Sequence, residues 1–269
     1  MTNKTNKVTY PKGVKVLFLD IENSKCLAGI FDRYTNIVPA SSIYTRSEVL
    51  MIGYKWHDEK KPTIITRRTH TKEEMMAQLA QILSEADLVV GHNLDKFDLP
   101  KLRTMAIDSG HPPLDIPRSV DTYKAAKSVF RFESNRLDDL GHYLGIGRKT
   151  KGISDLWDKI AIEQLKNGGV LEAPGNNTEL NAMLLLMEKY CKNDVFPLQQ
   201  KVYEAIRPYI KSHPNLSLLT KESTKTQCHK CGSMGVIKYG TRVLFQRLVQ
   251  RYRCNSCGSC QDIPKKKGE

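Results

Sequence analysis

Carboxylates that end apolar segments constrain the fold of this chain more than any other feature of its sequence. The run KVLFLDIE, residues 15 to 22, is apolar enough to predict a buried strand, and it ends in Asp20 and Glu22. Because side chains alternate faces along a strand, these two acids point to one side and Ile21 to the other. Two carboxylates on one face form half of a cation-binding cage, although acids at a solvated strand end are also ordinary.

A second acid follows another apolar run. The segment ADLVVGHN, residues 86 to 93, predicts a buried strand, and KFDLPKLRTMA after it predicts a helix that turns Phe97 toward a core. Asp98 then lies in the first helical turn, where the helix dipole stabilises an acid even if it has no other role. Asn93, five positions earlier, adds hydrogen-bonding groups beside this acid, whereas the neighbouring His92 is assigned no role.

The third acid lies in a long segment, residues 180 to 206, whose apolar spacing predicts one packed helix. Tyr190 and Asp194 are four residues apart, so they share one face of that helix. A tyrosine on a helix face is more often a core residue, but a phenol next to an acid can also orient a water molecule. The pair is informative because two acidic clusters precede it.

In order along the chain, the three motifs read D-I-E, N-x-x-x-F-D and Y-x-x-x-D. This series resembles the DEDD superfamily of 3'-to-5' exonucleases, and the tyrosine is typical of its DEDDy branch, which is similar to the proofreading domains of family B DNA polymerases. The resemblance covers roughly residues 10 to 207, including SVDTYKAAK and NRLDDLGHYLGI between the second and third motifs. It implies an α/β, RNase H-like fold with a mixed central sheet and flanking helices.

The resemblance also implies roles for the acids. Asp20, Glu22 and Asp194 would hold one divalent ion, and Asp20 and Asp98 would share a second. Oxygen ligands suit Mg2+ or Mn2+ better than zinc, and in a two-metal site one ion activates water while the other stabilises the leaving 3' oxygen. Tyr190 would position the water. The expected contacts to the terminal nucleotide are Asn93 and Phe97.

Two C-x2-C pairs near the carboxyl end, CHKCG and CNSCG, are typical of a tetrahedral zinc site that folds a segment too small for its own core. The expected ligands of one structural Zn2+ are Cys228, Cys231, Cys254 and Cys257. A glycine follows each pair, which favours these four over the spare Cys260. Disulfides are the alternative. The absence of a signal-peptide pattern and the leftover Cys26 and Cys191 favour a reducing cytoplasm instead.

Basic residues concentrate around the two cysteine pairs. Residues 221 to 269 hold eleven Lys or Arg against three acids, a large share of the formal net charge of +13. Between the pairs, apolar and aromatic residues interleave with Lys238, Arg242, Arg247, Arg251 and Arg253. This pattern predicts a small ribbon of strands with one charged face, and it is similar to zinc ribbons of some bacterial transposases. Beside a nuclease, it favours phosphate binding over a merely solvated surface.

Apolar runs predict strands interleaved with helices in the first two thirds of the chain. The strands are expected at residues 15–22, 49–57, 62–67 and 86–93, and the helices near 72–84, 96–108, 136–145 and 180–206. Residues 147–169 read as a variable insertion in which Lys149, Lys151 and Trp157 could reach a substrate, although Trp157 is more ordinary as a packing residue.

The expected domain order is an exonuclease domain, a linker, a ribbon and a basic tail. The ranges are 1–207, with 1–10 as a flexible N-terminus, then 208–226, 227–262 and 263–269. The first part of the linker, IRPYIKSHPN, could still pack on the exonuclease domain.

The residues and the resemblance together predict a metal-dependent 3'-to-5' exonuclease. It would release nucleoside monophosphates from single-stranded or frayed DNA ends, while the ribbon binds DNA or a replication or recombination protein. The alternatives are an RNA 3' exonuclease, an adaptor with an unused nuclease fold, and a structure-specific endonuclease. The complete acidic set argues against the adaptor, because convergent carboxylates repel one another without a cation. No run reaches the length of a membrane span, and a bacterial or phage-infected cytoplasm is expected.

Overall fold

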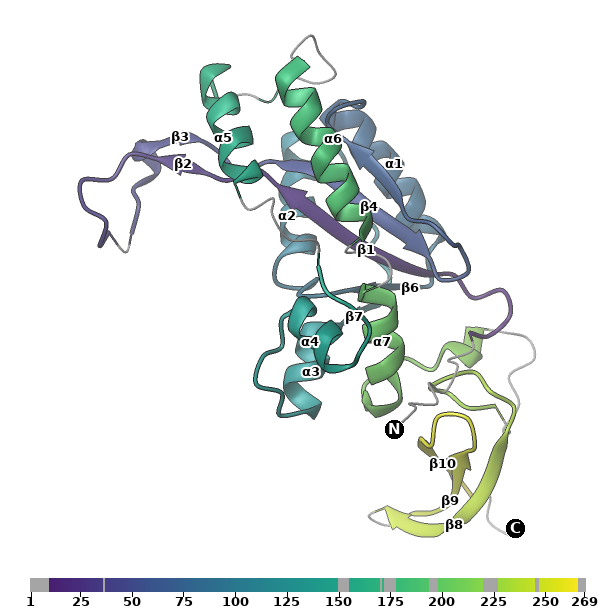
Figure 1. The fold of residues 1–269 in the computed structure, drawn as a ribbon. Coiled ribbons are helices and arrows are strands. Elements are labelled where there is room, and N and C mark those ends of the chain that lie inside the picture. The colour runs from purple at the N-terminus through teal and green to yellow at the C-terminus, as the bar shows by residue number, and fades with distance from the viewer. Residues whose placement is uncertain are drawn as a thin grey trace.

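The computed structural model describes residues 10–35, 37–149, 155–169, 171, 178–193, 198–219, 227–244 and 247–265. Its larger sheet has five strands in the order β5-β4-β1-β6-β7 (Figure 1). The strands are β1 (Val16–Asn23), β4 (Val49–Trp56), β5 (Thr63–Thr66), β6 (Leu88–Gly91) and β7 (Ser119–Asp121). β1 pairs antiparallel with β4 and parallel with β6, so the sheet is mixed, as predicted.

The central strand β1 separates two cores. Phe18 belongs to the core on one face of the sheet, whereas Leu19 and Ile21 belong to the core on the other face. The alternation of strand side chains therefore puts Asp20 and Glu22 on the same face as Phe18. Both acids lie near the end of the strand, where burial gives way to partial exposure.

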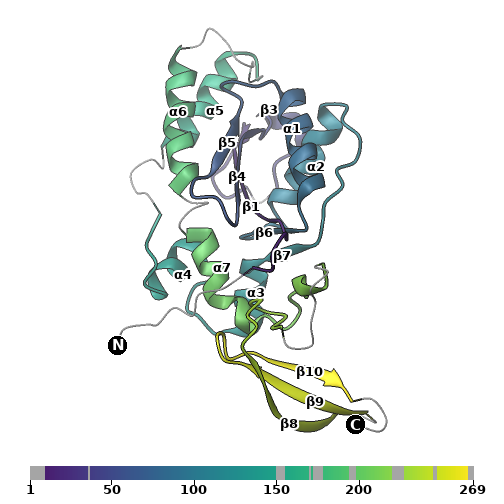
Figure 2. The ribbon, with the colours of Figure 1, turned by 90° about the vertical axis from the view of Figure 1, so that its right-hand side faces the viewer.

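Helices cover both faces of this sheet. Figure 2 shows the sheet edge-on between α1 and α2 on one side and α5 and α6 on the other. These helices are α1 (Lys72–Glu85), α2 (Asp98–Asp108), α5 (Leu156–Lys166) and α6 (Thr178–Asn193). α1 begins with a capping box in which Thr71 and Glu74 bond each other's backbone amides. The layered α/β arrangement expected from the apolar pattern is confirmed.

Three shorter helices pack together at one end of the sheet. They are α3 (Thr122–Val129), α4 (Leu137–Tyr143) and α7 (Gln200–Ile206), and their shared core includes Ala126, Leu140 and Val202. Within residues 180–206 the structure has α6, which ends at Asn193, and α7, which begins at Gln200. Residues 194–197 lie outside the described residues, so one continuous helix over 180–206 stays a prediction. The predicted insertion contains α5, whose Ile160 is fully buried, so it is part of the packed fold.

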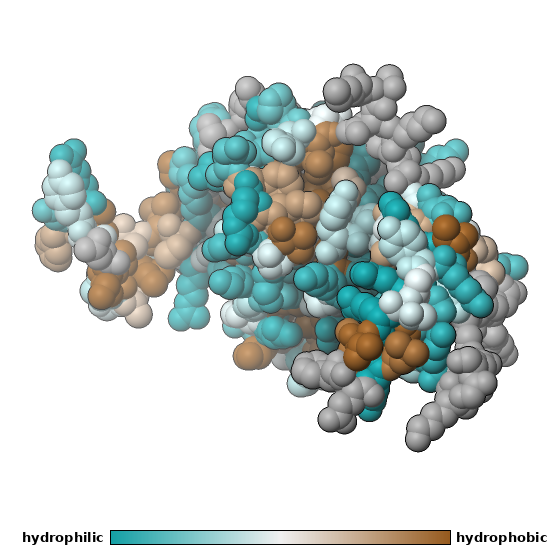
Figure 3. All heavy atoms as spheres, turned by 90° about the horizontal axis from the view of Figure 1, so that it is seen from below, coloured by the Kyte–Doolittle hydropathy of each residue, from teal (hydrophilic) through white to brown (hydrophobic). Residues whose placement is uncertain are grey.

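A two-stranded arm projects from the sheet after β1. It contains β2 (Leu27–Ala28), a 3-10 turn (Ala40–Ser42) and β3 (Ile43–Thr45). Its exposed apolar side chains include Ile30, Phe31, Tyr34, Ile37 and Tyr44. Figure 3 shows the arm at the left, with hydrophobic and hydrophilic atoms mixed along it.

The carboxyl-terminal segment forms a separate antiparallel sheet in the order β10-β9-β8. Its strands are β8 (Val236–Leu244), β9 (Arg247–Cys254) and β10 (Cys260–Pro264). Two short 3-10 helices, Arg207–Tyr209 and Leu216–Leu219, precede it, and Ile210 and Leu216 are buried in the core of the first domain. The first part of the expected linker thus packs on that domain. Among the described helices, none is both long and apolar enough to cross a bilayer.

Candidate functional site

Asp98 begins α2, and its side chain reaches back to β1. Its carboxylate accepts a hydrogen bond of 3.1 Å from the backbone amide of Ile21, and the residue is 2% exposed. Since Ile21 separates Asp20 from Glu22, the acid of the second motif contacts the strand segment that carries both acids of the first. Burial raises the pKa of Asp98 well above 3.8, and the negative charge of Asp20 raises this pKa further. A bound cation would relieve that repulsion.

Asp20 and Glu22 also approach α6. One carboxylate oxygen of each acid and the sulfur of Cys191 all lie within 4.8 Å of one another. The two acids are partly exposed, whereas Cys191 is fully buried. The helix that carries the third motif therefore packs against the strand that carries the first. Of that motif, Tyr190 is described and Asp194 lies outside the described residues.

Tyr190 is surrounded by residues of the predicted insertion. Its hydroxyl accepts a long hydrogen bond of 3.4 Å from the ammonium of Lys149, which also lies 5.5 Å from the centre of the phenol ring. Trp157 of α5 packs edge-on against the same ring at 5.3 Å. Tyr190 is only partly buried, so it reaches the surface between these two side chains. Lys151, the other insertion residue singled out in the sequence, lies outside the described residues.

The turn between β6 and α2 is held by an acid that sequence reasoning missed. Among the described residues other than glycine, Asn93 alone has a positive φ, of 65°, which asparagine tolerates better than most residues. The buried carboxylate of Asp121 accepts hydrogen bonds from the backbone amides of Asn93 and Asp95 at 3.0 and 3.2 Å. The same side chain caps α3. The sequence SVDTYKAAK did contain a signal for this role, because Asp121 stands between a strand and a helix, the usual place of a helix cap.

The helical pattern predicted that Phe97 faces a core. This prediction is wrong, because Phe97 is 43% exposed. It occupies the position immediately before α2, where the backbone is not yet helical, so the helical spacing does not apply to it. Phe97 lines a cleft of about 420 Å³ together with Glu22, Lys25, Lys101 and Trp157. That volume lies within the range of roughly 300–1,000 Å³ typical of small-ligand sites.

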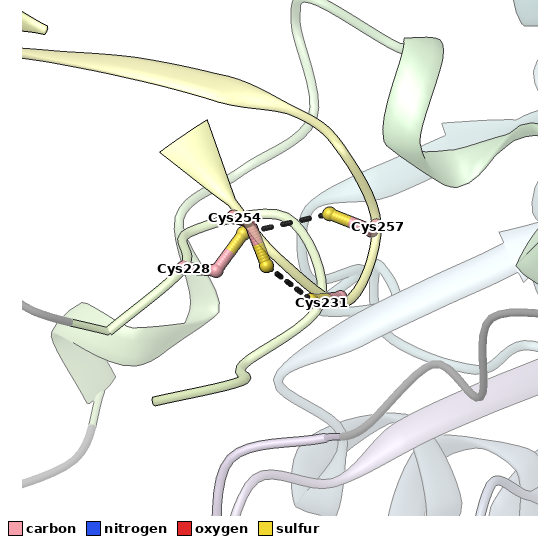
Figure 4. Close-up of side chains that lie close together, drawn as sticks. All are labelled: Cys228, Cys231, Cys254 and Cys257. Atoms are coloured by element: carbon pink, nitrogen blue, oxygen red, sulfur yellow. Dashed lines mark hydrogen bonds between the residues drawn. The ribbon is translucent and has the colours of Figure 1, made fainter. Parts of the chain in front are cut away.

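The four cysteines of the two C-x2-C pairs converge between the loops of the ribbon (Figure 4). The sulfurs of Cys228 and Cys257 are 3.7 Å apart, and those of Cys231 and Cys254 are 3.6 Å apart. A tetrahedron with Zn–S bonds of about 2.3 Å places its sulfurs roughly 3.8 Å from one another. The donor set therefore fits Zn2+ in type, number and spacing.

The two loops that present these cysteines have the same backbone structure. Gly232 and Gly258 have φ values of 74° and 70°, and each donates its amide to the carbonyl of the first cysteine of its pair, at 2.8 and 2.9 Å. Only glycine adopts this conformation without strain, which explains the glycine after each pair. Cys260 lies outside the cluster, in β10. Hydrogen bonding from Cys231 lowers the pKa of the Cys228 thiol, and the same bond raises the pKa of the Cys231 thiol.

Lys230 lies within the first pair and is 5% exposed, and among the described residues its ammonium has no hydrogen-bond partner. Burial, followed by the positive charge of Arg207, lowers the pKa of Lys230 to about 8, while Cys228 and Cys257 act in the opposite direction. Four thiolates around one Zn2+ carry a net negative charge. Zinc loading would therefore compensate a buried cation that is otherwise costly.

The ribbon sheet is solvated along most of β8, whose residues after Val236 are all exposed. Asp262 forms ion pairs with Arg242 and Arg251, at 2.5 and 3.7 Å, and so offsets part of the basic surface. The guanidinium of Arg253 lies 5.3 Å from the ring centre of Tyr239. Exposed cations beside an exposed aromatic ring are the groups that bind phosphate and stack on bases.

One comparison with known protein families agrees with this fold. Residues 41–156 match the family model of the RNase H superfamily, a range that includes Asp98 but not Asp20 or Tyr190. A solved structure that the chain resembles is the family B DNA polymerase of the hyperthermophilic archaeon Pyrobaculum calidifontis, with a TM-score of 0.42 and 17% identity over 90% of this chain. The chain spans 32% of that polymerase. The search of curated proteins found no match. The family match and the mixed central sheet flanked by helices fit an RNase H-like fold.

Proposed function

We propose that this protein is a metal-dependent 3'-to-5' exonuclease that removes nucleoside monophosphates from single-stranded or frayed DNA ends. The contact between Asp98 and Ile21 is the observation that carries this proposal, because it brings a buried acid to the strand segment of Asp20 and Glu22 and within electrostatic reach of Asp20. Buried or crowded carboxylates of this kind are stabilised by a cation. The RNase H-like fold supports hydrolysis of nucleic acid as the use of such a cation.

The carboxylates fit Mg2+ or Mn2+, which prefer oxygen ligands. In this proposal Asp20, Glu22 and Asp194 hold one ion, and Asp20 and Asp98 share the other. When bound, the two ions would supply an activated water and stabilisation of the leaving 3' oxygen. Tyr190 orients the water through its hydroxyl, because a phenol is a poor general base at neutral pH.

The cleft beside Glu22 is the proposed site for the terminal nucleotide. Phe97 offers an exposed ring on which a base can stack, and Lys25 and Lys101 supply positive charge along the same walls. Asn93, held by Asp121 at the start of the turn before α2, would contact the sugar or base. The preference for DNA rests on the motif series typical of proofreading domains.

The ribbon would bind one structural Zn2+ through its four clustered cysteines and hold the nucleic acid. Its exposed Lys238, Arg247 and Arg253 favour a phosphate backbone, and Tyr239 favours a single strand. A replication or recombination protein is the second candidate partner. Free thiols in the ribbon fit a reducing cytoplasm, such as that of a bacterial or phage-infected cell.

Competition between matched DNA and RNA oligonucleotides tests the substrate. Both strands carry a 5' label, and degradation is followed with Mg2+ and with Mn2+, with Asp20→Ala as the inactive control. A ladder that shortens from the 3' end of the DNA, with RNA competing at least ten times less well, is expected. Preferential RNA shortening would reassign the substrate. Internal fragments from either strand would instead indicate an endonuclease.

A further inference from the structure

Asp20, Glu22 and Cys191 bring their ligand atoms together, and of these three residues only Cys191 has no role in the proposed reaction. It is fully buried, and its neighbours in the core include Phe18 and Met187. Its sulfur nevertheless lies at the edge of that core, within 4.8 Å of an oxygen of Asp20 and an oxygen of Glu22. A residue that only fills space there could as well be alanine or valine, which would bring no metal ligand to the carboxylates.

Two carboxylates and a thiol form a mixed donor set. Hard ions such as Mg2+ have little affinity for sulfur, whereas Zn2+ and Cd2+ bind thiolates strongly and also accept carboxylate oxygens. A tetrahedral Zn2+ site needs bonds of about 2.0–2.3 Å, so its ligand atoms lie roughly 3.3–3.8 Å apart. The ligand atoms lie within 4.8 Å of one another, so they must approach by at most about 1.5 Å, which side-chain rotation can supply.

The surroundings of the cluster favour a divalent ion of either kind. Asp98 adds a third carboxylate beside Asp20 and is 2% exposed, so its negative charge is poorly solvated. A cation between these groups offsets that charge. The type of ion that remains bound is then decided by the ligand atoms nearest to it, among which the sulfur of Cys191 discriminates between hard and thiophilic metals.

We infer that Asp20, Glu22 and Cys191 form a binding site for a thiophilic divalent ion, Zn2+ or Cd2+, that competes with the catalytic ion. As the metal–sulfur bond forms, the thiol proton passes to solvent, and water completes the coordination. The inhibitory consequence rests on the proposed nuclease function, whereas the ligand set does not. The site makes the enzyme sensitive to thiophilic metals that an all-oxygen cluster binds less tightly.

Cadmium absorption tests the ligand set without any activity. The full chain, with its ribbon loaded with zinc, is titrated with Cd2+ while the ultraviolet sulfur-to-cadmium charge-transfer band is recorded. Cys191→Ala and Cys191→Ser remove the sulfur, and Cys260→Ser, outside both clusters, is the matched control. Cadmium that replaces zinc in the ribbon adds the same absorption to wild type and to the three variants. We expect a further band in wild type and Cys260→Ser that both Cys191 variants lack.

Zinc inhibition tests the consequence. Each protein is assayed with saturating Mn2+ and increasing Zn2+, and its rate is expressed relative to its own rate without Zn2+. We expect Cys191→Ala to require at least ten times more Zn2+ for half inhibition than wild type and Cys260→Ser. Thermal melting of each variant verifies folding. If the polar serine at this buried position prevents folding, the apolar Cys191→Ala variant still tests the inference.

The outcomes separate the two proposals. Identical cadmium bands in all four folded proteins would overturn the inference while leaving the nuclease untouched. A band that depends on Cys191 in a protein without nuclease activity would uphold the metal site and refute the proposed function. Equal Zn2+ sensitivity of wild type and Cys191→Ala would show that zinc inhibits elsewhere, and would overturn the claim that this site competes with the catalytic ion.

Discussion

The carboxylate of Asp98 accepts a hydrogen bond from the amide of Ile21, 77 residues earlier in the chain, at 3.1 Å. This bond joins the start of α2 to the end of β1, the two places where the sequence puts acids after apolar runs. It holds Asp98 within the electrostatic reach of Asp20 in a setting from which water is nearly excluded. Without a bound cation, the negative charges of Asp98 and Asp20 repel each other and destabilise the folded protein.

Asp98→Asn should stabilise the metal-free protein. Asparagine retains an oxygen that can accept the Ile21 amide, but it removes the charge whose burial is unfavourable. The raised pKa of Asp98 means that the folded state holds its proton more tightly than the unfolded chain does, so wild-type stability should fall as pH rises above 3.8. At pH 7 with a chelator, we expect the variant to melt several degrees above wild type.

The same variant should lose its response to metal. Mn2+ should raise the melting temperature of wild type but raise that of Asp98→Asn much less, and activity should fall by about 100-fold or more. Melting curves with chelator and with Mn2+ measure both effects. A variant less stable than wild type in chelator, and equally stabilised by Mn2+, would mean that the acid has a structural role only.

Asp121→Ala should destabilise the fold and the site together. The variant leaves the amides of Asn93 and Asp95 without their acceptor and removes the cap of α3, at a cost of about 3 kcal/mol. Asp95→Ala is the matched control, because it keeps the backbone amide that Asp121 binds and removes only the side-chain contacts of Asp95 with Ser119 and the exposed Lys124, so its loss should be smaller. Urea unfolding of the two variants measures the difference. Equal losses would show that Asp121 does not organise the turn.

Tyr190→Phe should slow turnover without weakening metal binding. The phenyl ring keeps its packing against Trp157, while the hydroxyl that contacts Lys149 is lost. We expect kcat to fall by about 10- to 100-fold, the size of a lost orienting contact, with an unchanged Mn2+ dependence. Tyr143→Phe, an exposed tyrosine of α4, is the control and should match wild type. A rise in the Mn2+ requirement of Tyr190→Phe would point to a role in metal binding instead.

Cys257→Ser should unfold the ribbon and weaken nucleic-acid affinity. Loss of one thiolate removes a zinc ligand, and so small a sheet has little core of its own. We expect Kd for single-stranded DNA to rise by about 10-fold, and the slope of log Kd against log salt to flatten, because phosphate contacts are lost. Cys260→Ser should leave both values unchanged. If Cys257→Ser loses zinc but keeps its affinity and salt slope, the ribbon binds a protein partner instead.

The sequence predicts the layers of the fold well because they depend on local periodicity. Period-two alternation in KVLFLDIE correctly assigned Ile21 to the face opposite Asp20 and Glu22, and the strands and helices around β1 follow apolar runs. The last helices are described as α6, up to Asn193, and α7, from Gln200, and the residues between 193 and 198 lie outside the part of the chain that the structure describes. The exposed position of Phe97 depends on where α2 begins, which spacing alone does not specify.

The site depends on contacts between distant segments, and these carry little local signal. Asp121 reads as a helix cap in the sequence, and only the fold shows that it also binds the turn before α2. Cys191 reads as a leftover thiol, because no spacing rule relates it to Asp20 and Glu22. In contrast, the clustering of the four cysteines could be predicted, since both pairs and their glycines act through short-range geometry, while zinc binding by them stays a prediction. The catalytic roles of the acids and Tyr190 stay predictions.

Release of a 3'-terminal label from single-stranded DNA tests the central claim most directly. Wild type, Asp20→Ala and Asp98→Asn are compared with Mn2+ on one oligonucleotide that carries its radioactive nucleotide at the 3' end. We predict that wild type frees the label as a mononucleotide before any shorter internal fragment forms, and that both variants are slower by about 100-fold or more. Label released in longer fragments, or at equal rates by all three proteins, would contradict an exonuclease built on these acids.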